Sequence, residues 1–165
     1  MTTRHRAAVA LGANLGDPAQ TFERALALLA REVGPVVARS AWRTTPALVH
    51  PDDPVREHPP YLNGVVLLES ELGAEAILAR LHAIERTLGR DRAGELRPWQ
   101  PRMLDLDLVA LDQEVREPPT TPVLPHPRMH ERDFVLGPFV EIWPHWRHPR
   151  LGKTARELLA ELERH

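Results

Sequence analysis

Apolar and acidic residues alternate strictly along residues 104–108. A period of two is typical of a strand with one buried face, so the leucines share one face and Asp105 and Asp107 the other. Two residues along a strand cover roughly 6.6 Å. The two carboxylates are therefore close enough to share one hard cation or to hold a pair of cations. The alternative is a solvated strand face that carries two aspartates by chance.

Other apolar runs and helical spacings predict the elements on either side of this strand. Apolar runs predict three strands, at 7–11, 36–44 and 61–69. Apolar residues at helical spacing predict helices at 18–33 and 74–88. Asp17 is a suitable N-cap for the first helix, and Pro18 suits its first position.

The sequence after the acidic strand predicts shorter helices and strands. Residues 111–115 indicate a hairpin turn into a short strand, and residues 134–142 a short helix broken near Pro138. Thr154 and Glu157 form a capping box before a final apolar stripe, which predicts a last helix.

The predicted order of elements is β-α-β-β-α-β. This order is typical of an α+β, ferredoxin-like (βαββαβ) fold, in which an antiparallel sheet carries both main helices on one face. The C-terminal elements are additional to that fold. At 165 residues the chain is expected to form a single domain over 1–165.

Composition narrows the function classes. The formal net charge of −2 argues against a general nucleic-acid or membrane-surface binder. Cysteine is absent, which excludes thiol catalysis and Cys-based zinc sites and fits a cytoplasmic protein. No apolar run in the sequence approaches the length of a membrane span.

An arginine-rich segment, residues 86–102, precedes the acidic strand. It contains five arginines against two acidic residues, and its prolines and glycines predict a loop. Proteins commonly bind polyphosphates through a divalent metal ion together with arginine side chains. One interpretation is therefore that a metal-bound anion lies between this loop and the acidic pair. The other is a solvated arginine-rich loop. The glycine-rich turn at 12–16 lacks the ending of a P-loop and is interpreted as structural.

Eight short motifs between about residue 8 and residue 145 occur together in this chain. They are LGANLGD from Leu11, RT from Arg43 with Pro46, YLN from Tyr61, IE from Ile84, GRDR from Gly89, WQPRMLDLD from Trp99, LPHPR from Leu124 and RDFVL from Arg132. In this combination the chain resembles the 6-hydroxymethyl-7,8-dihydropterin pyrophosphokinase family of folate synthesis.

The resemblance implies transfer of the β,γ-diphosphate of ATP to the hydroxymethyl oxygen of the pterin, leaving AMP. It assigns Asp105 and Asp107 to two Mg²⁺ ions that bridge the triphosphate, in agreement with the interpretation from alternation. Arg92 and Arg102 are expected on the phosphates, because a planar guanidinium matches their oxygens, with Arg90 as a third candidate. No general base is assigned, and a monomer is expected.

The resemblance also implies the binding residues. Tyr61 and Phe134 would sandwich the pterin ring, Asn63 would hydrogen-bond its edge, and Thr44 would lie at the same pocket. Further residues map to the nucleotide side; these are Glu85, Trp99, Leu108, His126 and Arg132. The alternative for His126 is a satisfied loop histidine, and for Glu85 a solvated helix residue. His82 and Val123 depart from the family pattern, where a glutamine and a hydroxyl residue occur.

Two other function classes are compatible with parts of the sequence. A metal-dependent phosphodiesterase or nuclease could use the same acidic pair, although the balanced net charge offers no broad cationic groove. A non-catalytic ferredoxin-like module could bind RNA, but it would need aromatic residues interleaved with basic ones on a strand. The pterin pyrophosphokinase interpretation accounts for more of the chain than either.

Overall fold

A computed structural model describes residues 3–46, 51–52, 59–89 and 103–164 of the chain. Its centre is a five-stranded sheet in which every recorded strand pair is antiparallel. The strand order is β2-β4-β1-β5, and β3 also pairs with β4. The strands are β1 (His5–Ala13), β2 (Val36–Arg39), β3 (Arg43–Thr45), β4 (Tyr61–Ser70) and β5 (Asp105–Leu111).

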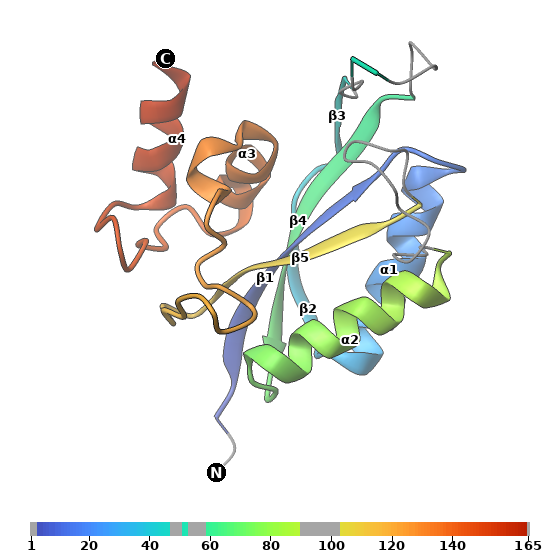
Figure 1. Cartoon of the computed structure of the whole chain (residues 1–165), viewed down its shortest axis with the longest axis horizontal. Helices are drawn as coiled ribbons and strands as arrows, with labels where there is room; N and C mark the ends of the chain where they lie inside the picture. Colours follow the sequence, from blue (N-terminus) through green and yellow to red (C-terminus); the bar gives the residue numbers. More distant parts are fainter. Residues whose placement is uncertain (1–2, 47–50, 53–58, 90–102, 165) are drawn as a thin grey trace.

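The helices cover both faces of this sheet. They are α1 (Pro18–Glu32), α2 (Ala74–Thr87), the short 3₁₀ helix η2 (Met129–Glu131), α3 (Asp133–Ile142) and α4 (Ala155–Glu163). The helices α1 and α2 lie on one side of the sheet, and α3 and α4 lie on the other (Figure 1). The element order and the position of α1 and α2 confirm the predicted ferredoxin-like fold, with the C-terminal helices as its additional layer. No helix in the described part of the chain is long and apolar enough to cross a membrane.

Alternate residues of the central strands supply two separate cores. Val9, Leu11 and Val66 pack against α1 and α2, whereas Ala8 and Val65 pack against α3 and α4. A strand buried on both faces in this way reads as a continuous apolar run, which is what β1 and β4 show. The sheet therefore has a helix-covered face on each side.

The predicted helix caps form. The Asp17 side chain accepts a hydrogen bond from Gln20 N–H at 3.2 Å, and Pro18 occupies the first position of α1. Thr154 and Glu157 make both hydrogen bonds of the capping box of α4, at 3.2 Å and 3.0 Å. Each cap satisfies amide groups that the first helical turn leaves without an intrahelical partner.

The predicted strand at 36–44 is wrong in one respect, because it is broken into β2 and β3. Ser40 interrupts it: the Ser40 hydroxyl accepts a hydrogen bond from Val65 N–H at 3.0 Å, in place of a backbone carbonyl. The Trp42 ring lies directly over Gly64 of β4, where a Cβ atom would come within 2.2 Å of the ring. Both partners lie on β4, so the local pattern did not reveal the break.

Two predictions for the C-terminal half are corrected. No strand follows the turn at 111–115; this part of the chain makes only an isolated bridge between Arg116 and Leu124. The helix α3 continues through Pro138, where a break was expected. The proline removes one backbone donor. The residues of α3 from Val135 to Phe139 are all buried, and their packing holds the helix together.

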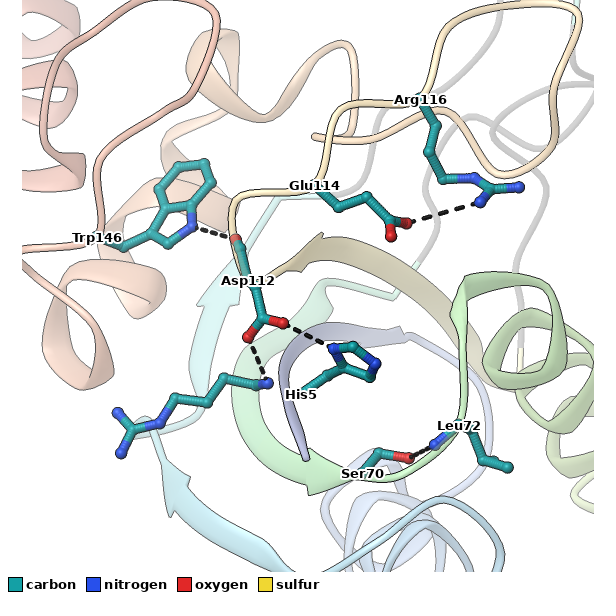
Figure 2. Close-up of polar contacts among 8 residues, drawn as sticks. His5, Ser70, Leu72, Asp112, Glu114, Arg116 and Trp146 are labelled. Carbon is teal, nitrogen blue, oxygen red and sulfur yellow. Dashed lines mark hydrogen bonds and ion pairs between the residues drawn. The ribbon is translucent and has the colours of Figure 1, made fainter. Parts of the chain in front are cut away.

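Asp112 ties the end of β5 to the start of β1. Its carboxylate accepts from Arg6 N–H at 2.8 Å and contacts His5 Nδ1 at 2.8 Å, and its backbone carbonyl accepts from the Trp146 indole at 2.7 Å (Figure 2). The residue has a φ of 50°, a conformation that aspartate tolerates better than most residues. Asp112 thus joins β1, β5 and the segment before α4 at one end of the sheet.

Candidate active site

The acidic pair lies at the start of β5, an edge strand of the sheet. Asp105 and Asp107 are half-buried, whereas Leu106 and Leu108 are 1% and 3% exposed and belong to the core under α1 and α2. The predicted alternation is therefore confirmed. The two carboxylates point to the face that carries α3, away from the larger core.

One row of residues crosses the sheet at this level. Gly12 of β1 pairs with Asp105 on one side and with Asn63 of β4 on the other, and Asn63 pairs with Arg43 of β3. Directly opposed residues in antiparallel strands share a face, so Asn63 and Asp105 lie on the same face with Gly12 between them. Two strand spacings separate them by roughly 10 Å.

Gly12 leaves the floor between these two side chains open. A Cβ atom at Gly12 would lie 3.8 Å from Asn63 Oδ1, in ordinary contact with it. The space above Gly12 is thus bounded by an amide on one side and a carboxylate on the other. This arrangement suits a flat polar molecule held at one edge by Asn63.

Asn63 is 7% exposed, and a neighbouring hydroxyl fixes its orientation. Its Nδ2 donates to Thr45 Oγ1 at 2.8 Å, and Thr45 pairs with Tyr61 on the same face. Tyr61 itself is half-buried at the start of β4. One face of two adjacent strands therefore presents an amide, a hydroxyl and an aromatic ring.

Thr44 lies on the opposite face of the sheet. It pairs with Leu62 and lines a cavity of about 410 Å³ together with residues 14–19, which form the loop before α1 and its first two residues. The hydroxyl beside Asn63 comes instead from Thr45, which the sequence analysis missed. Strand parity was the available signal, because Thr45 and Asn63 are on the same face whenever Thr45 opposes Tyr61.

His126 anchors the LPHPR connector to the outer edge of β5. Its N–H donates to Val109 O at 2.8 Å, and its Nδ1 accepts from Arg128 N–H at 3.2 Å. Burial, with a smaller effect of nearby Arg132 and Arg128, lowers the pKa of His126 to about 4, and Asp105 opposes this shift. The ring is therefore neutral at pH 7. With Nδ1 accepting, its Nε2 carries the proton and can donate to an anion.

Phe134 lies in the first turn of α3 and is 38% exposed, unusually high for such a ring. The guanidinium carbon of Arg132 lies 5.7 Å from the centre of the ring. Because Arg132 also acts on the pKa of His126, these residues form one neighbourhood with Asp105. An exposed aromatic ring beside a cation can stack on a planar ligand.

The positions of the Glu85 and Leu108 side chains differ from those expected of residues that contact a nucleotide directly. Glu85 is 1% exposed, so the alternative of a solvated helix residue is wrong; its Oε2 accepts from Leu106 N–H at 2.8 Å. The Leu108 side chain is buried in the core, which leaves only its backbone to reach a ligand.

His82 and Val123 are half-buried. The predictions for Arg90, Arg92, Trp99 and Arg102 lie outside the described residues.

The acidic pair fits a Mg²⁺ site of a particular kind. In the parts of the chain that the structure describes, no three His, Cys, Asp or Glu side chains gather as a complete ligand set. Mg²⁺ is commonly bound through one or two carboxylates, with water and substrate phosphates filling its other positions. Two half-buried carboxylates on one face of β5 match that pattern.

Comparison with solved structures agrees with this fold. The chain superimposes on Plasmodium falciparum HPPK-DHPS with a TM-score of 0.73 at 12% sequence identity, covering 97% of this chain and 44% of that one. A second structure, described as HPPK-DHPS in complex with substrates, gives a TM-score of 0.72 at 14% identity, with 96% and 43% coverage. The chain thus spans less than half of each of these proteins.

Sequence comparison identifies the family. A protein of Synechocystis sp. named 2-amino-4-hydroxy-6-hydroxymethyldihydropteridine pyrophosphokinase is 39% identical, over 96% of this chain and 77% of that protein. The protein of that name from Methylorubrum extorquens is 38% identical, over 96% and 94%. The family model for 7,8-dihydro-6-hydroxymethylpterin-pyrophosphokinase (HPPK) matches residues 8–144. The chain belongs to this family of ATP-using transferases, which carry out the pyrophosphokinase step of folate biosynthesis.

Proposed function

We propose that Asp105 and Asp107 bind two Mg²⁺ ions that hold ATP for transfer of its β,γ-diphosphate to 6-hydroxymethyl-7,8-dihydropterin. The observation that carries this proposal is the position of both carboxylates on one face of an edge strand, with Asp105 in line with Asn63 across Gly12. The Asp105 end of this row would bind the metal and the phosphates, and the Asn63 end, about two strand spacings away, would bind the pterin ring. A pterin lying over Gly12 would direct its hydroxymethyl group toward the acidic pair.

The pterin end of the site uses shape and hydrogen bonding. Asn63, oriented by Thr45, presents an amide edge that both donates and accepts, which matches the edge of a pterin ring. Tyr61 and Phe134 supply flat apolar faces for the ring. These residues bind and orient the acceptor alcohol but do not take part in bond making.

The chemistry is a transfer between two oxygens. The hydroxymethyl oxygen forms a bond to the β-phosphorus, the bond from that phosphorus to the oxygen shared with the α-phosphate breaks, and AMP leaves with that oxygen. The hydroxyl proton is released to solvent. Mg²⁺ held by Asp105 and Asp107 would neutralise negative charge on the phosphates. Such transfers depend on positioning and electrostatics more than on a protein base.

Neutral His126 and the arginines complete the phosphate end. The Nε2–H of His126 can donate to a phosphate oxygen without the cost of a buried positive charge. Arg132 lies in the same neighbourhood, and Arg92 and Arg102 are the proposed guanidinium partners from outside the described residues. Arginine suits this role because its planar fork matches phosphate oxygens.

Substitution of each aspartate tests the proposal. Asp105→Asn and Asp107→Asn remove one negative charge each at nearly constant shape, and each should lower kcat by roughly 10²–10³-fold, the scale on which removing one transition-state contact acts. Pterin-dependent AMP formation from ATP is the activity to measure. Mn²⁺ binding followed by electron paramagnetic resonance should weaken in parallel. Glu163→Gln, an exposed residue of α4, is the charge-matched control.

Two results would contradict the metal assignment. One is full activity in either aspartate variant; the other is undiminished activity of the unaltered protein in excess EDTA. ADP as the product, in place of AMP, would contradict transfer of the diphosphate. Loss of Mn²⁺ binding with retained AMP formation would separate the cation from the reaction.

We also infer that the enzyme acts as a single-domain monomer. Every residue assigned to the site belongs to one chain, so no second copy is needed to complete it. Light scattering coupled to size exclusion should give a mass near the 18.7 kDa of the sequence. A dimer that persists on dilution would overturn this inference.

A further inference from the structure

Among the described residues, Glu85 is the most deeply buried ionisable side chain beside the acidic strand. It projects from the last turns of α2, is 1% exposed, and its Oε2 accepts a hydrogen bond from Leu106 N–H at 2.8 Å. The donor is a backbone amide of β5, 21 positions away in the sequence. Glu85 thus links α2 directly to the strand that carries Asp105 and Asp107.

This hydrogen bond lies on the outer edge of β5. Among the described residues, the sheet order β2-β4-β1-β5 gives β5 a partner strand on one side only. Alternate amides of such an edge strand point away from the sheet and need an acceptor from elsewhere when they are buried. Glu85 provides that acceptor at Leu106.

The amide of Leu106 belongs to the peptide unit that joins it to Asp105. Fixing this unit restricts the backbone angles on either side of it, and hence the directions in which Asp105 and Asp107 project. A second edge contact, from His126 N–H to Val109 O at 2.8 Å, holds the strand again three residues later. Asp107 lies between the two anchors.

Strand register makes this anchoring important for the site. The side-chain period of a strand is two, so a slip of one residue would turn both carboxylates into the α1/α2 core. β5 already contains one irregularity, a register shift against β1 between Ala8 and Val9. An anchor on the other edge of β5, upstream of this shift, restrains the end that carries the acidic pair.

We propose that Glu85 is a positioning residue that holds β5 in the register and orientation in which Asp105 and Asp107 bind metal together. The proposal rests on the metal role proposed above. It differs from a direct nucleotide contact, because Glu85 acts here through the backbone of Leu106. The proposed role requires only a side-chain oxygen at position 85 that accepts a hydrogen bond from Leu106 N–H.

Three variants of Glu85 separate the acceptor from the rest of the side chain. Glu85→Gln keeps an oxygen at the same reach, Glu85→Asp withdraws the carboxyl group by one methylene, and Glu85→Ala removes it. Glu75→Ala, an exposed residue of the same helix, is the control. Should Glu85→Ala not fold, the Gln and Asp variants make the same comparison between an acceptor in reach and one out of reach.

Hydrogen exchange of the Leu106 amide in the metal-free protein is the direct measurement. We expect exchange at least 10-fold faster in the Ala and Asp variants, and within about threefold of the unaltered protein in the Gln variant, since a net hydrogen bond is worth about a factor of ten. The Mg²⁺ concentration for half-maximal activity should rise at least 10-fold in the Ala and Asp variants, and kcat should fall. The Gln variant should restore both.

Other patterns would overturn the proposal. If Leu106 exchange is unchanged in the Ala and Asp variants, the hydrogen bond does not restrain β5. If Gln behaves like Ala, or if all variants raise only the KM for ATP, Glu85 is a nucleotide contact and not a positioning residue. The exchange experiment is done without metal. Its result on the Leu106 hydrogen bond therefore holds even if the Asp105 and Asp107 variants disprove the metal role.

Discussion

Asn63 and Asp105 lie on the same face of the sheet, in one row, with only Gly12 between them. The two residues are 42 positions apart in the sequence but two strands apart in space. Because the intervening residue has no side chain, no Cβ atom stands between Asn63 and Asp105 in this row. This relationship makes the width of the site depend on a single glycine.

Substitution of Gly12 should therefore affect substrate binding more than folding. In Gly12→Ala the new Cβ lies 3.8 Å from Asn63 Oδ1, an ordinary contact, so the melting temperature should change by only about 2 °C. The added methyl group occupies the floor of the site, and the KM for the pterin should rise roughly 10-fold, equivalent to about 1.4 kcal/mol. Gly12→Leu should abolish activity. Steady-state kinetics and thermal denaturation measure the two effects.

Gly73→Ala is the matched control for this experiment. Gly73 precedes α2, and a Cβ there meets nothing within 4 Å, so the variant reports the general effect of replacing glycine by alanine. Unchanged pterin kinetics in Gly12→Leu would show that the substrate does not lie over this row.

Thr45 should contribute more to pterin binding than Thr44. Thr45→Val keeps the shape of the side chain but removes the hydroxyl that accepts from Asn63 Nδ2, so the amide loses its fixed orientation. The KM for the pterin should rise about 10-fold, with a smaller effect on kcat. Thr44→Val, on the opposite face of β3, is the paired variant and should leave the KM for the pterin within about twofold. The reverse order of effects would restore Thr44 to the pocket.

The sequence predicted those features that depend on local pattern. The alternation from Leu104 fixed the faces of β5 correctly, because a period of two needs no information from other strands. The caps at Asp17 and Thr154 were predicted for the same reason. Ferredoxin-like topology followed from the order of these elements. The assignment of ligands to particular residues came from resemblance to the family and remains a prediction.

Features that depend on distant partners escaped the sequence analysis. The break at Ser40 needs Val65 as donor, and the role of Glu85 needs an amide on β5. Likewise, the choice between Thr44 and Thr45 depends on which of them opposes Tyr61 across two strands. Pairing of this kind is set by register, which one strand's residues cannot specify alone.

Asp112 should govern stability without affecting catalysis. Asp112→Ala removes the acceptor for Arg6 N–H and the contact with His5, and it also places alanine at a φ of 50°. The free energy of unfolding should fall by about 2–3 kcal/mol, the sum expected for a lost hydrogen-bonded side chain and a strained backbone. Asp105 lies seven residues away along the strand, roughly 23 Å, so kcat should not change. Urea denaturation and steady-state kinetics make the comparison.

A glycine variant separates the two causes of the stability lost in Asp112→Ala, the missing side-chain contacts and the strained backbone. Asp112→Gly loses the same contacts but accepts a positive φ at no steric cost, so it should recover part of the stability lost in Asp112→Ala. Glu114→Ala, an exposed neighbour, is the control and should change stability by no more than about 0.5 kcal/mol. Equal losses in the Ala and Gly variants would assign the whole effect to the hydrogen bonds.

Stability should decrease in mild acid because of His148. This residue is 4% exposed, and burial, with nearby His130 and Arg150 adding to it, lowers its pKa from 6.5 to about 4. Between these two values the unfolded chain binds a proton that the folded chain does not, so stability is full above pH 6.5 and is lost as the pH falls toward 4. The loss attributable to His148 is at most about 3 kcal/mol.

His148→Asn tests this linkage without removing the hydrogen bonds that the residue makes. His148 Nδ1 accepts from Arg150 N–H and Leu151 N–H, both at 3.2 Å, and an asparagine oxygen can accept at a similar position. Urea denaturation between pH 7 and 4.5 should show a shallower loss of stability in the variant than in the unaltered protein. Part of the slope should persist, because His126 also has a lowered pKa. His145→Asn, at an exposed position, should leave the slope unchanged; an equal slope in His148→Asn would mean that the buried ring does not control the acid response.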